Sequence, residues 1–112
     1  MPGDDRQALL ERELQRYVDV LAAEVKPERV IAFGSLVSGQ PHIASDIDLV
    51  VITRTALPFW KRLRELRRIL RPRVSTDLLV YTPEEFAVLS EERAFVRDEI
   101  AGKGRVLYAQ GR

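Results

Sequence analysis

The chain has 112 residues, a formal net charge of +1 at pH 7 and no cysteine. This length allows one compact domain, so we expect a single domain over residues 1–112, and the near-zero charge gives no global attraction to nucleic acid or membranes. Without cysteine, disulfides, thiolate catalysis and cysteine-ligated metal sites are excluded. The charged N-terminal segment and the absence of a long apolar run predict a cytoplasmic protein with no membrane association.

The first half of the chain predicts one helix followed by two strands. Apolar residues at three- and four-residue spacing over residues 5–25 are typical of an amphipathic helix, and Pro27 ends it. The apolar run 29–33 predicts a buried strand. Residues 36–45 contain glycine and proline and predict a short turn of helix or a loop, and the β-branched run 47–53 predicts the clearest strand of the chain.

The second half predicts a strongly basic helix, a third strand and shorter elements. The helix begins at residue 57 or 58 and continues to 71, and a strand is expected over 74–81. Thr82-Pro83-Glu84-Glu85 is a helix start with a capping box, and one or two short helices continue to about residue 101. A last short strand is expected over 105–108. This order indicates an α/β domain with a small mixed sheet and helices mainly on one side.

Two aspartates bracket the start of the strand at residues 47–53. Because successive strand side chains alternate between faces, Asp46 and Asp48 are expected on one face, with attachment points about 7 Å apart. Carboxylates this close repel each other, and oxygen ligands suit Mg²⁺ or Mn²⁺. Asp77 lies in another apolar strand and can face the same site if the two strands are neighbours. The three carboxylates then predict a two-metal site for phosphoryl or nucleotidyl transfer.

Gly34-Ser35 directly follows a predicted strand and precedes a turn or helix. Glycine lets the backbone approach a phosphate closely, and the N–H groups that follow can bind phosphate oxygens together with the Ser35 hydroxyl. The pair therefore predicts a triphosphate-binding turn beside the carboxylates.

Phe33-Gly34-Ser35, then ten residues, then Asp46-Ile47-Asp48 resembles the signature of the polymerase-beta-like nucleotidyltransferase superfamily. The small size resembles its minimal nucleotidyltransferase (MNT) group, and the similarity extends through the strand with Asp77 to Gly104-Arg-Val-Leu-Tyr108. The resemblance implies the family's fold and a metal-dependent transferase. By position, Gly34 and Ser35 would bind the triphosphate, Asp46 and Asp48 the metal, and Asp77 would help to hold metal and activate the acceptor.

The resemblance also implies a partner. Minimal family members are often antitoxins encoded beside an all-helical HEPN toxin ribonuclease, and some of them adenylylate a tyrosine of that toxin. We therefore predict that the chain transfers AMP from ATP to a hydroxyl of such a partner. The acceptor pocket is expected to come from a second protein or from a second copy of this chain.

Three other interpretations stay open at this level. The chain can instead be a non-catalytic antitoxin, because Leu36, Val37 and Ser38 stand where many minimal relatives carry an arginine. The basic face over residues 61–73 can contact RNA, although a solvated helix face is slightly favoured. Asp77 can form a structural ion pair, for example with Arg73. Two single residues have comparable alternatives: His42 is a surface-loop residue or lies at the site, and Trp60 stacks a base or packs in a core or interface.

Overall fold

The structure is a computed structural model that describes residues 2–34 and 46–110. The described residues form a four-stranded sheet in the order β3-β2-β1-β4. Strand β1 is antiparallel to both β2 and β4, whereas β2 and β3 are parallel, so the sheet is mixed as predicted. The strands span Arg29–Phe33 (β1), Ile47–Ile52 (β2), Thr76–Tyr81 (β3) and Arg105–Ala109 (β4).

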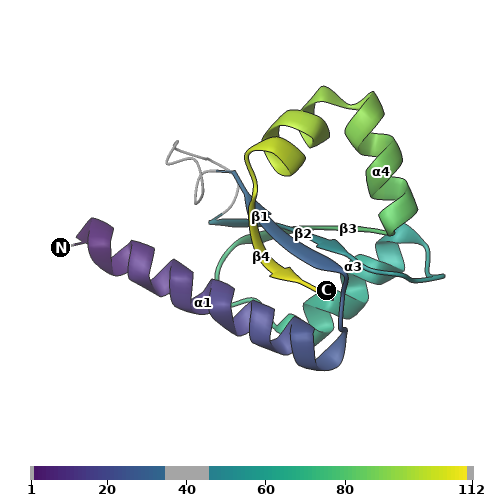
Figure 1. Ribbon diagram of the computed structural model, residues 1–112. Helices are drawn as coiled ribbons and strands as arrows, with labels where there is room; N and C mark the ends of the chain where they lie inside the picture. Colours follow the sequence, from purple (N-terminus) through teal and green to yellow (C-terminus); the bar gives the residue numbers. More distant parts are fainter. Residues whose placement is uncertain (1, 35–45, 111–112) are drawn as a thin grey trace.

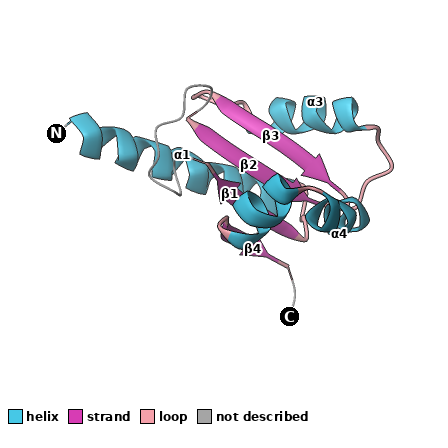
Figure 2. Ribbon diagram, turned by 90° about the horizontal axis from the view of Figure 1, so that it is seen from above, coloured by secondary structure: helices cyan, strands magenta, loops and turns pink. Residues whose placement is uncertain are grey.

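Helices cover both faces of this sheet, as Figures 1 and 2 show. The two longest, α1 (Pro2–Glu24) and α3 (Phe59–Leu70), pack on one face, in line with the expectation that helices lie mainly on one side. The α-helix α4 (Pro83–Glu92) and the π-helical segment η1 (Val96–Gly102) pack on the other face. The physical reason is that β2 is buried along its whole length, so both of its faces need cover.

The alternation of side chains along the strands produces two separate cores. The face toward α1 and α3 contains Ile47, Leu49 and Val51, and the predicted apolar stripe of α1 packs on it. The opposite face contains Val50 and Ile52, packed against residues of α4 and η1. Asp48 and Asp77 therefore belong to the α4 and η1 face by the same alternation.

Arginines of α3 protect the outer edge of the sheet. Strand β3 is an edge strand, and an edge strand has backbone groups without a neighbouring strand. Arg62 Nη1 donates to the Val80 carbonyl at 3.2 Å, and Arg67 Nη2 donates to the Thr76 carbonyl at 2.6 Å. Part of the basic face predicted from the sequence therefore has a structural role. Its arginines donate hydrogen bonds to carbonyl groups of β3 and so fix the strand that carries Asp77.

Candidate functional site

The predicted site residues of the strands meet at one end of the sheet. Asp48 and Asp77 are register partners on the parallel strands β2 and β3, and Phe33, the last residue of β1, is the register partner of Asp48 on its other side. Neighbouring strands lie about 4.8 Å apart, so the two aspartates are adjacent on the same face. The condition stated from the sequence, that their strands are neighbours, is confirmed. Asp48 is buried, with 3% of its surface exposed, whereas Asp77 is exposed.

Gly34 lies directly against the Asp48 carboxylate. Its φ of +79° is in the left-handed region that glycine adopts without steric cost. A Cβ built on Gly34 would overlap with Oδ2 of Asp48. Both observations require glycine here, and they place the turn after β1 beside the carboxylate, where the sequence predicted a phosphate-binding backbone.

Asp46 is placed differently from the other two aspartates. It precedes β2 by one residue, and its carboxylate forms an ion pair with the Arg6 guanidinium of α1. The sequence prediction did not include Arg6, which lies 40 residues away along the chain. Among the described residues, no group of three or more aspartate, glutamate, histidine or cysteine side chains is arranged to hold a metal ion. The structure thus brings Asp48 and Asp77 together and directs Asp46 to Arg6.

The donor chemistry of this end of the sheet fits a hard divalent cation. Two carboxylates directly opposite each other on neighbouring strands are destabilising as like charges, and a cation between them removes that repulsion. All candidate donors are oxygens, which suits Mg²⁺ or Mn²⁺ better than zinc. Ser35, the loop expected over 36–45 and His42 lie outside the described residues.

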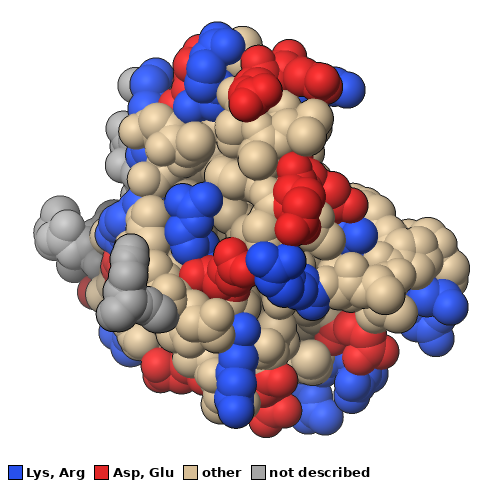
Figure 3. Space-filling view, turned by 45° about the vertical axis from the view of Figure 1, so that its right-hand side comes forward, with Lys and Arg blue, Asp and Glu red and all other residues tan. Residues whose placement is uncertain are grey.

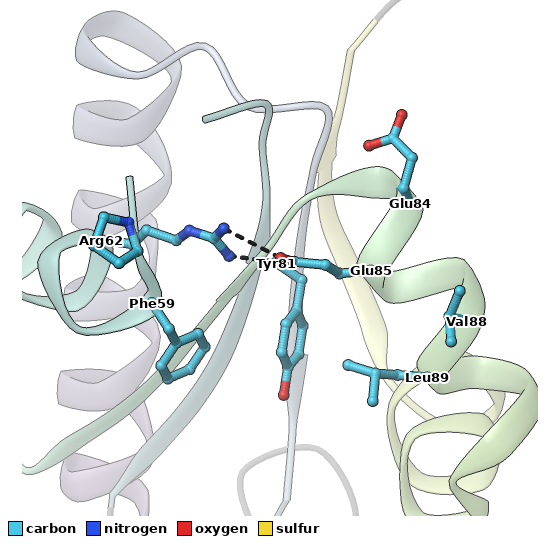
Figure 4. Close-up of a pocket in the computed structure, with 8 residues that line it drawn as sticks. Phe59, Arg62, Tyr81, Glu84, Glu85, Val88 and Leu89 are labelled. Carbon is cyan, nitrogen blue, oxygen red and sulfur yellow. Dashed lines mark hydrogen bonds and ion pairs between the residues drawn. The ribbon is translucent and has the colours of Figure 1, made fainter. Parts of the chain in front are cut away.

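A hollow lies at the other end of β3. It has a volume of about 710 Å³ and is bounded by the start of α3, the end of β3 and α4. Figure 4 shows Phe59, Tyr81 and Leu89 around it, with the Arg62 guanidinium bound to Glu85 at 2.7 Å. Arg62 is 8% exposed and also donates to the Leu57 carbonyl at 2.7 Å. No pattern in the sequence predicted this hollow, because its lining comes from three separate elements.

Charge on the surface is mixed. Figure 3 shows acidic and basic side chains interspersed over one face, where no large area carries a single sign. Of the arginines in the predicted basic face, Arg62 binds Glu85, Arg68 binds Glu65 and Arg67 binds a backbone carbonyl. These contacts leave fewer cations for phosphate groups than the sequence pattern suggested. No helix of the described residues is long and apolar enough to cross a membrane.

Comparisons with known proteins agree with this arrangement. The family model for "Polymerase beta, Nucleotidyltransferase" matches residues 14–112. The structure is similar to a crystal structure from Sulfolobus solfataricus classed as a nucleotidyltransferase, with a TM-score of 0.70, 18% identity, and coverage of 98% of this chain and 89% of that chain. It is also similar to a toxin–antitoxin crystal structure with AMP-PNP, with a TM-score of 0.51, 19% identity, and coverage of 86% and 73%. Among curated protein sequences, none matches.

The match to the family model spans most of the chain, which therefore belongs to the polymerase beta nucleotidyltransferase family. This confirms the resemblance seen in the Gly-Ser and Asp-x-Asp motifs. The two structural similarities are below 25% identity and establish the shared fold.

Proposed function

We propose that the chain is a metal-dependent adenylyltransferase of the minimal nucleotidyltransferase type. The observation that carries the proposal is the register of Asp48 with Asp77, beside the left-handed turn at Gly34. Gly34 lets the turn pack directly against the Asp48 carboxylate, and Ser35 follows it in the sequence. Bound Mg²⁺ or Mn²⁺ would neutralise charge on the triphosphate and polarise the acceptor oxygen.

Each carboxylate has a distinct role in this proposal. Asp48, buried at the end of β2, is a fixed ligand whose position depends on its packing. Asp46 would complete the ligand set when its carboxylate is released by Arg6. Asp77 is exposed on the edge strand, so it can reach an incoming hydroxyl, orient it and accept its proton. Positioning and charge neutralisation supply most of the catalysis in such transfers.

The acceptor in this proposal is a hydroxyl on a partner protein of the HEPN toxin type. The toxin–antitoxin complex with AMP-PNP that shares this fold supports a pairing of this kind of domain with a nucleotide and a protein. Asp77 is also exposed on the edge strand, which suits an acceptor presented by another molecule.

Label transfer from ATP tests the proposal directly. The purified protein is incubated with Mg²⁺ and ATP labelled at the α-phosphate, with and without the protein encoded by the adjacent gene. We expect label on the partner and its loss when EDTA is added. Label that requires neither metal nor this chain would contradict the proposal, and label on added RNA instead of protein would change the acceptor class.

The second candidate function is a non-catalytic antitoxin that neutralises its partner by forming a complex. The ion pair between Arg6 and Asp46 favours it, because a guanidinium then occupies a predicted metal ligand. One experiment, neutralisation of the partner by a variant without the two carboxylates, distinguishes the two functions. Full neutralisation of the partner by the Asp46→Asn, Asp48→Asn double variant would support complex formation and count against transfer as the mechanism.

Removing the Arg6 side chain is expected to increase metal affinity. Because Arg6 is a cation bound to Asp46, it competes with a metal for that carboxylate, and Arg6→Ala should lower the Mn²⁺ dissociation constant about two- to fivefold. Calorimetric titration with Mn²⁺ measures this. Arg12→Ala, which removes an exposed arginine of the same helix, is the control and should change nothing. Weaker Mn²⁺ binding by Arg6→Ala would show that Arg6 supports the site instead of competing for it.

A further inference from the structure

Phe95 is a large apolar side chain that remains 54% exposed. It immediately precedes η1, and its ring contacts the ring of Phe33 edge to face, with centroids 5.9 Å apart and an angle of 81° between the planes. Phe33 itself is buried and is the register partner of Asp48. Phe95 therefore contacts Phe33, which pairs with the buried Asp48. About half of the Phe95 surface faces solvent.

The position of Phe95 is fixed by its neighbours. Val96 and Ile100, which follow it in η1, are 6% and 1% exposed and pack in the core with Phe33. An exposed ring whose backbone is held in this way loses little conformational freedom when it binds a ligand. Short π-helical segments such as η1 are also frequent at functional sites.

The other exposed aromatic side chains are at the wrong end of the sheet for the carboxylates. Phe59 contacts Tyr81, the last residue of β3, with ring centroids 5.9 Å apart, and Trp60 follows Phe59 in α3. Tyr81 is the fourth residue after Asp77 along the strand, a spacing of about 13 Å. Among the exposed aromatic rings of the described residues, Phe95 is thus the one that contacts the register partner of Asp48. The stacking role considered for Trp60 from the sequence fits Phe95 better.

We propose that the exposed ring of Phe95 stacks on the nucleobase of the triphosphate held at Asp48 and Asp77. This inference rests on the proposed function and adds the contact that recognises the base. An apolar ring has no hydrogen-bonding group, so it binds any base through its π face and favours the larger purines over pyrimidines. Phe95 is therefore a specificity-determining residue that acts on nucleotide affinity.

Binding of two probes tests the inference without an acceptor. The dissociation constants of ATP and of inorganic tripolyphosphate are measured by calorimetry with Mg²⁺ for the wild type, Phe95→Ala and Phe95→Leu. Both variants are expected to bind ATP about tenfold more weakly and tripolyphosphate with unchanged affinity. The preference of the wild type for ATP over CTP should disappear in both. Trp60→Ala, which removes the most exposed aromatic ring elsewhere, is the control and should bind ATP like the wild type.

Three further outcomes are decisive. Phe95→Leu keeps an apolar contact with Phe33, so a loss of ATP binding in Phe95→Ala that is absent in Phe95→Leu would overturn stacking in favour of a packing role. Unchanged ATP affinity in both variants would overturn the inference and leave the proposed function standing. Failure of the wild type to bind either probe with Mg²⁺ would overturn the proposed function and this inference with it.

Discussion

Replacing Asp48 with asparagine is expected to reduce AMP transfer about a thousandfold while raising the stability of the protein. The loss follows from removal of a buried carboxylate that would hold the metal ion, and a thousandfold loss corresponds to about 4 kcal/mol of transition-state stabilisation. The gain follows from the register with Asp77, because like charges directly opposite on neighbouring strands cost about 0.2–1 kcal/mol. A melting temperature higher by about 1–4 °C should accompany the loss of activity.

The paired readout makes this prediction specific. Rates of label transfer and thermal unfolding curves are recorded for Asp48→Asn beside Asp98→Asn, which alters an exposed aspartate paired with Arg97. The control should keep the transfer rate of the wild type. If Asp48→Asn lost stability instead of gaining it, Asp48 would be a structural residue. If it kept its activity, the transfer chemistry would have to reside elsewhere.

Most elements of the fold could be predicted because their signals are local. The capping box at residues 82–85 is present, with Glu85 N–H donating to the Thr82 hydroxyl at 3.1 Å and Thr82 N–H donating to Glu85 Oε1 at 2.9 Å. The apolar run predicted as a strand over 47–53 forms β2. The sequence did not predict which face α4 and η1 cover, because their few apolar residues indicate burial but not the face of the sheet that they contact.

The candidate site could be predicted only where strand alternation applies. Asp48 and Asp77 each stand in an otherwise apolar strand sequence, so the pattern indicates a functional role for both carboxylates, and parallel pairing then aligns them. Arg6 and Phe95 carry no such signal, because one is an ordinary helix residue and the other an ordinary apolar residue. Their roles depend on contacts with Asp46 and Phe33, which are distant in the sequence.

The segment that leads into β3 is held by an ion pair of α1. Glu13 is 6% exposed and accepts two hydrogen bonds from Arg16, at 2.9 and 2.6 Å, and one from the Arg73 N–H at 2.9 Å. Arg16 in turn donates to the carbonyl of Leu70 at 2.8 Å, at the end of α3. This cluster attaches α1 to the connection between α3 and β3. Because that connection begins the strand that carries Asp77, the cluster also helps to position the site.

Glu13→Gln is therefore expected to lower the free energy of unfolding by about 2–3 kcal/mol at pH 7 and to have almost no effect at pH 2. Hydrogen bonding from Arg16 lowers the pKa of Glu13 from 4.5 to about 2. A pKa lowered in the folded state adds stability that is complete above pH 4.5 and is lost as the pH falls through about 2. Urea unfolding from pH 7 to pH 2 measures the difference between the two proteins.

The control for this prediction is Glu65→Gln, which alters a glutamate in an exposed ion pair with Arg68 at the same three-residue spacing. Exposed pairs contribute little, so this variant should follow the wild type at every pH. A difference between Glu13→Gln and the wild type that persisted at pH 2 would mean that Glu13 acts through its shape and packing. A difference that closes only at acid pH assigns the attachment of α1 to the carboxylate charge, and it makes the alignment of β3, with Asp77 on it, sensitive to the same protonation.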